Sequence, residues 1–261
     1  DPLKDKLLHI DLKRIAMDVK MQVSVPIHLV GEAAGVKSVK VYSREESARA
    51  VQRMTQRVSE GGGATICATA IRTLPGLAAL ANGTSAHGIE MDDTHSGGSI
   101  HLGATMYAVA LALVESEPGI PADQFLTAIV AGFEAAARIA MAVQPKEHYA
   151  LGFHPTPTCG VFGAAITAAK LLGLTATQTR DAVGIAGTMA AGSMEFLAEG
   201  AWTKRMHPGW AAHAGYRAAR MAQAGFTGPR TLFDGEHGFF HAFANSDGCD
   251  FTEMLSGAGE Q

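Results

Sequence analysis

Residues 158–191 read TCGVFGAAITAAKLLGLTATQTRDAVGIAGTMAA, and this stretch decides the fold class. Small and aliphatic residues fill it, Gly173 ends one predicted helix, and Thr175 with Gln178 predicts a capping box at the start of the next. Glycine inside a helix costs roughly 1 kcal/mol relative to alanine, but small residues let helices approach closely. The stretch therefore predicts tightly packed helices.

Apolar residues at helical spacing continue in both directions from this stretch. Ser43 with Glu46 predicts another capping box, and Pro121 and Pro208 suit the first turn of a helix. The predicted helices are residues 43–58, 75–92, 101–115, 121–143, 158–172, 175–191 and 208–225. Beyond residue 42, only ATICAT near residue 64 resembles a strand. The sequence thus predicts a mainly α fold, with an all-α domain over residues 43–261.

The first 42 residues differ in composition from the rest. Six of the nine lysines fall in the first 40 residues, but only three of the 46 alanines do. MQVSVPIHLV (residues 21–30) alternates apolar and polar residues, which is typical of a half-buried strand. We therefore expect a separate, short β-rich segment over residues 1–42.

Composition and charge exclude several classes of protein. The chain is 47% hydrophobic and 18% charged, which excludes a disordered protein. Cys67, Cys159 and Cys249 are isolated, so neither a disulfide scaffold nor a structural zinc site is expected, and a cytoplasmic location is the default. The net charge of −4 gives no argument for nucleic acid or an anionic membrane. No apolar run reaches about 18 residues, so no membrane span is predicted.

The densest polar cluster is EMDDTH (residues 90–95), followed by SGGSI and His101. If the preceding helix continues, Glu90, Asp93 and Thr94 share one face and Asp92 points elsewhere. The glycine-rich turn would let His101 fold back toward them, and carboxylates beside a histidine adjust each other's pKa for acid–base chemistry. The alternative is an ordinary acidic helix end at the surface.

Two other positions suit anion binding. His154 lies just before a predicted helix, where free N–H groups can receive a carboxylate, although a histidine packed in a proline-rich turn is equally consistent with GFHPTPTCG. Lys204 is one of three lysines after residue 42 and stands in apolar sequence, so it is a candidate for binding an anion. A solvated lysine is the alternative. His207 and His213 are interpreted as polar core or interface groups.

Motifs for metals and nucleotide cofactors are missing from the sequence. There are eleven histidines, but no HExxH motif. The triple glycine at 61–63 lacks the lysine and hydroxyl residue of a phosphate loop, and no GxGxxG follows a strand. We therefore expect neither a catalytic metal nor a nucleotide cofactor.

Several long motifs, in order, resemble the MmgE/PrpD family. They are LANGTSAHGIEMDDTH, GFHPTPTCGVFGAAITAAKLLGL, EFLAEGAWTKRMHPGWAAHAG and GFTGP. The resemblance implies a large helical domain, a smaller lid domain, a homodimer, and cofactor-independent chemistry on small polycarboxylates, as in 2-methylcitrate dehydratase and cis-aconitate decarboxylase. The lid would follow Phe243, so we expect this chain to lack it and to be truncated relative to the family.

The resemblance also implies site residues. Thr94, His101, His154 and Lys204 fall at the family's site positions, and Glu90 falls where the family commonly has Asp. We expect a lyase in which His101, Glu90, Asp93 and Thr94 are catalytic and His154 and Lys204 bind substrate carboxylates. A proton would move at the carbon next to a carboxylate, and a hydroxyl or carboxyl group would depart. The alternatives are an epimerase of the family, an inactive helical remnant, and a binding protein for carboxylates or RNA.

The opening residues carry a second resemblance. DPLKDKLLHIDLKRI and VPIHLVGEAAGVKS resemble the middle of the general-stress ribosomal protein family that binds 5S ribosomal RNA. The likeness spans about 40 residues at the seam between two domains of that family, so most of its RNA-contacting surface would be missing. A solvated strand face is the favoured interpretation of the lysines, and we do not expect a nucleic-acid partner.

Overall fold

The computed structural model describes residues 44–59, 61–244, 249 and 251–255, so the predicted β-rich segment 1–42 lies outside the described residues. Helices dominate the described part, and this confirms the mainly α prediction. The helices are α2 (Glu46–Val58), α3 (Pro75–His87), α4 (Gly103–Ser116), α5 (Ala122–Ala142), α6 (Pro145–Ala150), α7 (Pro155–Leu171), α8 (Ala176–Gly187), α9 (Phe196–Glu199), α10 (Thr203–Gln223), α11 (Phe239–Phe243) and α12 (Phe251–Leu255). β1 (Ala64–Thr65) and β2 (Arg72–Thr73) pair antiparallel. β1 covers the first two residues of the predicted ATICAT strand, whereas β2 was not predicted.

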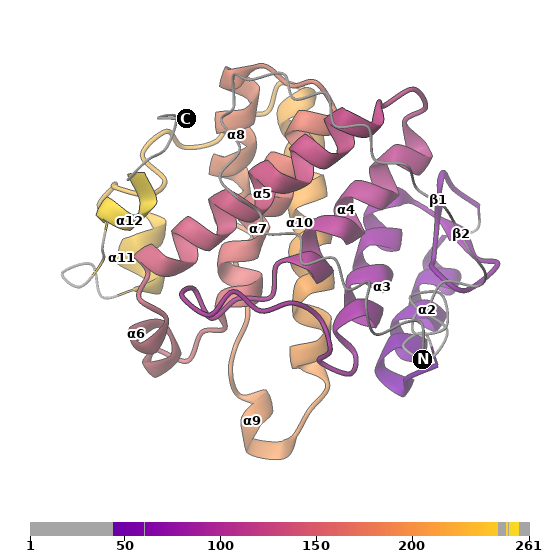
Figure 1. Cartoon of the computed structure of the whole chain (residues 1–261), viewed down its shortest axis with the longest axis horizontal. Helices are drawn as coiled ribbons and strands as arrows, with labels where there is room; N and C mark the ends of the chain where they lie inside the picture. The colour runs from indigo at the N-terminus through magenta and orange to yellow at the C-terminus, as the bar shows by residue number, and fades with distance from the viewer. Residues whose placement is uncertain (1–43, 60, 245–248, 250, 256–261) are drawn as a thin grey trace, which may run out of the picture.

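Helices α7 and α10 form the centre of the bundle. They pack against each other, with α3 against α10 and α5 against α7, while α4 and α8 complete the surround (Figure 1). Every residue of α7 except Ile166 and Lys170 is buried. A helix that is apolar on all sides must be covered on all sides, and the sequence of α7 meets that requirement.

Glycines set how closely these helices approach. A Cβ atom on Gly209 of α10 would lie 2.2 Å from the carbonyl oxygen of Leu80 in α3, and one on Gly83 would lie 2.6 Å from the Cα of Gly209. A Cβ on Gly215 would lie 2.5 Å from the Cβ of Ala164 in α7. The small residues of the sequence are therefore the contact points of the bundle, as predicted.

Local signals placed several helix ends correctly. Thr175 and Gln178 form the predicted capping box of α8, and Gly173 follows α7 with a positive φ of 64°. The predicted Ser43 cap lies outside the described residues. In its place Glu45 caps α2, because its carboxylate accepts hydrogen bonds from the backbone N–H groups of Ser47 and Ala48.

Two helices begin earlier than predicted. Helix α7 begins at Pro155 instead of residue 158, since first-turn N–H groups have no partner in the helix and prolines are tolerated there. Helix α10 begins at Thr203, five residues before the predicted start, and holds Pro208 in its interior. Pro208 has no N–H to donate to the Lys204 carbonyl four residues back, so α10 gives up that backbone hydrogen bond. As a result of the earlier start, Lys204 lies in the first turn of α10.

One described helix, α5, is long and apolar enough to cross a membrane by length and composition alone. This is weak support for a membrane span, because a core helix of a water-soluble protein meets the same criterion. Glu134 and Arg138 form an ion pair on this helix. Leu126 and Val130 are exposed on it, and Tyr107 and Leu111 are exposed on the neighbouring α4. Together these four residues form an apolar face across α4 and α5.

Candidate active site

The loop between α3 and α4 carries most of the predicted site residues. Helix α3 ends at His87 instead of Asp92, so Glu90, Asp93 and Thr94 do not share a helical face, and that prediction was wrong. The backbone of Glu90 is already in the left-handed region, with φ at 55°. Gly88 itself keeps a right-handed backbone, with φ at −57°, so the helix end is not a left-handed glycine cap. Figure 1 shows the loop crossing near the lower ends of α7 and α10.

The loop folds back so that His101 meets Thr94. The backbone N–H of His95 donates to the carbonyl of Ile100 at 2.9 Å, which closes the glycine-rich turn. The Nδ1 atom of His101 then lies 3.3 Å from the Thr94 hydroxyl and 3.0 Å from the backbone carbonyl oxygen of Asp93. The sequence predicted a turn that brings His101 back toward Thr94, and the structure has this turn.

Asp92, which was predicted to point elsewhere, is the carboxylate that faces His101. Its Oδ2 atom lies 3.4 Å from His101 Nδ1 and 2.9 Å from Nδ1 of the buried His87. Burial opposes ionisation of Asp92, but hydrogen bonds from His101 and His87 outweigh it and hold its pKa well below the usual range. The same hydrogen bond raises the pKa of His101.

The Asp93 carboxylate is used at the start of α4. Its Oδ1 atom accepts a hydrogen bond of 2.8 Å from the backbone N–H of Gly103. A Cβ on residue 103 would lie 2.2 Å from that oxygen, so only glycine permits this contact. Burial raises the pKa of Asp93. The structure therefore uses the predicted catalytic carboxylate of Asp93 to hold the start of α4.

Lys204 forms an ion pair with Glu90. Its Nζ atom lies 2.5 Å from Oε2 of Glu90, and both side chains are partly exposed. The hydrogen bond from Lys204 lowers the pKa of Glu90. Arg205, the next residue of α10, pairs with Glu45 at the start of α2. Two consecutive cations therefore fasten the beginning of α10 to two separate segments.

His154 lies at the N-terminal end of α7, as predicted, and pairs with His207 of α10. The two Nδ1 atoms are 2.9 Å apart and both side chains are buried. Burial lowers the pKa of His154 to about 2 and that of His207 to about 4, so both rings are neutral near pH 7. Sequence reasoning had treated His207 only as a polar core or interface group.

These groups meet in one region of the fold. The backbone N–H of His101 donates to the hydroxyl of Thr156 in the first turn of α7, at 3.2 Å. The contact between His154 and His207 joins α7 to α10, and the ion pair between Lys204 and Glu90 joins α10 to the loop. The α3–α4 loop and the N-terminal ends of α7 and α10 therefore converge, although they are far apart in sequence.

A hollow lies beside this region. It has a volume of about 610 Å³ and is lined by residues of the segment before α10 and by Phe196, Met206, His207 and Trp210. His207 lines the hollow and is hydrogen-bonded to His154, so one member of the buried histidine pair borders it. A small organic ligand could occupy it.

His87, Asp92 and His101 are a group among the described residues whose donor atoms could hold a metal ion, since these atoms lie within 4.8 Å of one another. The 2.9 Å between His87 Nδ1 and Asp92 Oδ2 is also an ordinary hydrogen-bond length. The expectation that the protein binds no metal stays a prediction.

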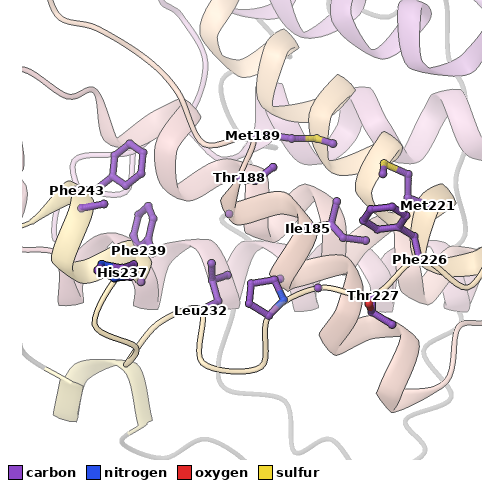
Figure 2. A pocket seen from close by; sticks show the side chains of 16 residues that line it. Ile185, Thr188, Met189, Met221, Phe226, Thr227, Leu232, His237, Phe239 and Phe243 are labelled. Atoms are coloured by element: carbon purple, nitrogen blue, oxygen red, sulfur yellow. The ribbon is translucent and has the colours of Figure 1, made fainter.

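A second cavity, of about 370 Å³, lies between α8, the end of α10 and the segment leading to α11. Figure 2 shows Ile185, Met221 and Phe226 at one end, Phe239 and Phe243 at the other, and Leu232 between them. None of the site residues described above lines this cavity. Its lining is apolar, and it offers no cluster of charged groups for a polar substrate.

Comparison with known proteins gives consistent matches. Residues 34–252 match the MmgE/PrpD N-terminal domain. The chain is 34% identical to the cis-aconitate decarboxylase-like protein oryM of Aspergillus oryzae over 64% of this chain, and 34% identical to the cis-aconitate decarboxylase of Homo sapiens over 67% of it. Each match covers 36% of the relative. Separately, 14% of the chain is 54% identical to the large ribosomal subunit protein bL25 of Geobacter sulfurreducens, covering 19% of that protein.

Proposed function

The chain belongs to the MmgE/PrpD family, and we propose that it provides the helical part of a lyase site for a small di- or tricarboxylate such as cis-aconitate or 2-methylcitrate. The observation that carries this proposal is the convergence of three separate segments, the loop with Glu90 and His101, the start of α7 with His154 and the start of α10 with Lys204, through the contacts described above. The relatives named as cis-aconitate decarboxylases support the same substrate class.

Lys204 and the start of α7 would bind the substrate carboxylates. Lys204 is partly exposed, and its ion-pair partner among the described residues is the exposed carboxylate of Glu90, which a substrate carboxylate can replace. His154 precedes the first turn of α7, where backbone N–H groups lack helical partners and favour an anion. The neutral His154–His207 pair can donate a hydrogen bond to a carboxylate without the cost of burying a charge.

His101 would move the proton at the carbon next to a carboxylate, with Glu90 as the other candidate. In dehydration the base removes this proton and a hydroxyl group leaves; in decarboxylation the carboxyl group leaves as carbon dioxide and the carbon receives a proton. Negative charge builds up near the substrate carboxylate in both reactions, and Lys204 is placed to stabilise it. Thr94 fixes His101 through the contact between its hydroxyl and Nδ1.

The chain spans less than two fifths of the length of the relatives that it matches. The activity of a whole relative is therefore a proposal for this chain. An epimerase of the same family would use the same proton removal without loss of a group. An inactive helical domain that still binds carboxylates is the other alternative.

We also propose a homodimer through the apolar face of α4 and α5. Tyr107 and Leu111 are one helical turn apart on α4, and Leu126 and Val130 are one turn apart on α5. The edge contact between Tyr107 and Phe133, with ring centroids 6.3 Å apart, joins the two helices. A second copy of the chain would remove this apolar surface from water.

The test is to incubate the purified chain with cis-aconitate, 2-methylcitrate and citrate and to follow products by proton NMR. A decarboxylated or dehydrated product that disappears in Lys204→Ala, but not in Lys170→Ala, supports the lyase. Exchange of a substrate proton for deuterium without loss of a group would favour the epimerase. Binding of the three compounds without any of these reactions would favour the inactive domain.

A further inference from the structure

His87 is a buried histidine that no role assigned above explains. Its side chain is fully buried in the last turn of α3, and its Nδ1 atom lies 2.9 and 3.0 Å from the two carboxylate oxygens of Asp92. Its Nε2 atom is buried and has no hydrogen-bond partner among the described residues. An unpaired buried nitrogen destabilises the folded chain. Any favourable interaction of the His87 ring with a polar group is therefore its Nδ1 contact with Asp92.

The surroundings of His101 fix where its proton lies. Nδ1 faces the carbonyl oxygen of Asp93 at 3.0 Å, the carboxylate of Asp92 at 3.4 Å and the hydroxyl of Thr94 at 3.3 Å. A carbonyl and a carboxylate can only accept hydrogen bonds. Nδ1 therefore donates, and in the neutral ring Nε2 carries the lone pair.

We propose that Asp92 and His87 are positioning residues that hold His101 in this tautomer, with Nε2 as the atom that exchanges a proton with the substrate. The inference rests on the proposed function for the role of His101. In the step, the substrate proton passes to Nε2, the proton on Nδ1 stays in place, and the positive charge of the ring is balanced by Asp92. His87 donates its Nδ1 proton to Asp92 and keeps the carboxylate oriented.

Electrostatics support the same arrangement. Asp92 stays ionised because hydrogen bonds from His101 and His87 overcome the effect of burial on its pKa. Asp92 in turn raises the pKa of His101, against burial and the positive charge of Lys204, which act to lower it. Among the groups near His101, Asp92 stabilises its protonated form and Lys204 opposes it. The carboxylates of Glu90 and Asp93 also interact with it electrostatically, and the ring centroid of His87 lies 4.5 Å from that of His101. A carboxylate behind the ring is the usual device for steadying a catalytic histidine.

The test is NMR of the full chain labelled with ¹⁵N-histidine, in which His101 is identified by its loss in His101→Gln. His101 should show the tautomer with the proton on Nδ1, and Asp92→Asn should lower its titration midpoint by about one pH unit or more. His87→Gln should lower it in the same direction by a smaller amount. Asp181→Asn, which removes a carboxylate on α8, is the control and should leave it unchanged.

Either of two kinds of result would overturn the inference, one from the NMR measurements on His101 and one from added metal. One is a proton on Nε2 of His101 in the unmodified chain, or a midpoint unchanged in both Asp92→Asn and His87→Gln. The other is tight binding of added zinc ions that shifts the His87 and His101 signals together, which would make the cluster a metal site.

Neither NMR measurement needs turnover, so a chain that catalyses no reaction can still confirm or overturn the tautomer. Where product does form, Asp92→Asn should lower kcat by about 100-fold or more and leave KM nearly unchanged. A merely structural role for Asp92 would instead lower the folded fraction without shifting the midpoint of His101 in the molecules that stay folded.

Discussion

The ammonium group of Lys204 lies 2.5 Å from a carboxylate oxygen of Glu90, although the two residues are 114 positions apart in the chain. This ion pair joins the first turn of α10 to the loop after α3. An exposed pair of this kind contributes little to stability, about 0–1 kcal/mol. The pair matters for the proposed function because Glu90 would compete with a substrate carboxylate for the ammonium group of Lys204.

Replacing Lys204 with alanine should weaken binding of cis-aconitate about 10- to 100-fold, because a charge-assisted hydrogen bond to a carboxylate is lost. Isothermal titration calorimetry of the full chain measures this directly. Lys170→Ala, on α7, should bind as the unmodified chain does. Equal affinity in all three proteins would remove Lys204 from the site.

Replacing Glu90 with glutamine should have the opposite effect on binding. The side chain keeps its size but loses the charge that competes for Lys204, so the dissociation constant for citrate should fall about 3- to 10-fold at low salt. Glu147→Gln on α6 serves as a control that removes the same charge elsewhere. If Glu90→Gln binds citrate more weakly, Glu90 orients Lys204 and does not compete with the substrate.

The sequence predicted the longer helices from local signals, missed the short helices α6, α9, α11 and α12, and mispredicted the site loop for a physical reason. Thr175 with Gln178 and Gly173 act within one turn of the chain, so their effect could be predicted without knowledge of the fold. Helix α3 ends at a glycine that keeps a right-handed backbone, so no left-handed glycine marked the end, and the polar residues that follow also fit a continuing helix. Asp92 was therefore assigned to the wrong face.

Contacts between distant segments could not be predicted in this way. The pairs His154–His207 and Lys204–Glu90 exist because α7, α10 and the α3–α4 loop pack together. The family resemblance placed Lys204 and His154 among the site residues, but neither resemblance nor spacing identified His87. Its burial and its contact with Asp92 are features of the folded chain.

Stability should rise with pH between about pH 4 and pH 6.5. Burial lowers the pKa of His148 to about 4, as it does for His207, and that of His154 to about 2. Below the usual histidine pKa the unfolded chain binds protons that these folded residues do not, so acid favours unfolding. At pH 5 this amounts to about 2 kcal/mol for each buried histidine. His101 acts in the opposite sense: its raised pKa adds stability that is present in acid and is lost as pH rises through that pKa.

Urea unfolding of the full chain near pH 5 and near pH 7 measures this dependence. His148→Gln should reduce the difference between the two pH values by about 2 kcal/mol, since one proton-linked group is removed. His241→Gln, at an exposed position, should leave the difference unchanged. An equal difference in all three proteins would mean that burial of His148 is not linked to proton binding.

Replacing Gly209 with alanine should destabilise the chain by about 1–3 kcal/mol, because the added methyl group would lie 2.2 Å from the Leu80 carbonyl oxygen. Helices α3 and α10 would have to separate. The control is Gly160→Ala on α7, where the nearest atom to the new Cβ is at 3.6 Å and the higher helix propensity of alanine should add up to about 1 kcal/mol. Thermal unfolding distinguishes the two variants. Similar melting temperatures would mean that the contact at Gly83 and Gly209 tolerates a wider spacing.

Replacing Leu126 with aspartate should convert a homodimer into a monomer. Leu126 is 58% exposed on α5, and a charge there would be buried without a partner in the proposed interface. Light scattering after size-exclusion chromatography gives the mass of each species, and Leu197→Asp, on α9 and 70% exposed, is a control outside the apolar face of α4 and α5.

Because α5 also meets the length and composition of a membrane span, flotation with phosphatidylcholine vesicles tests the competing occupant of this face. An unmodified chain that is monomeric and floats with the vesicles would contradict the dimer, whereas a dimer that is lost only in Leu126→Asp would assign the apolar face to a second copy of the chain.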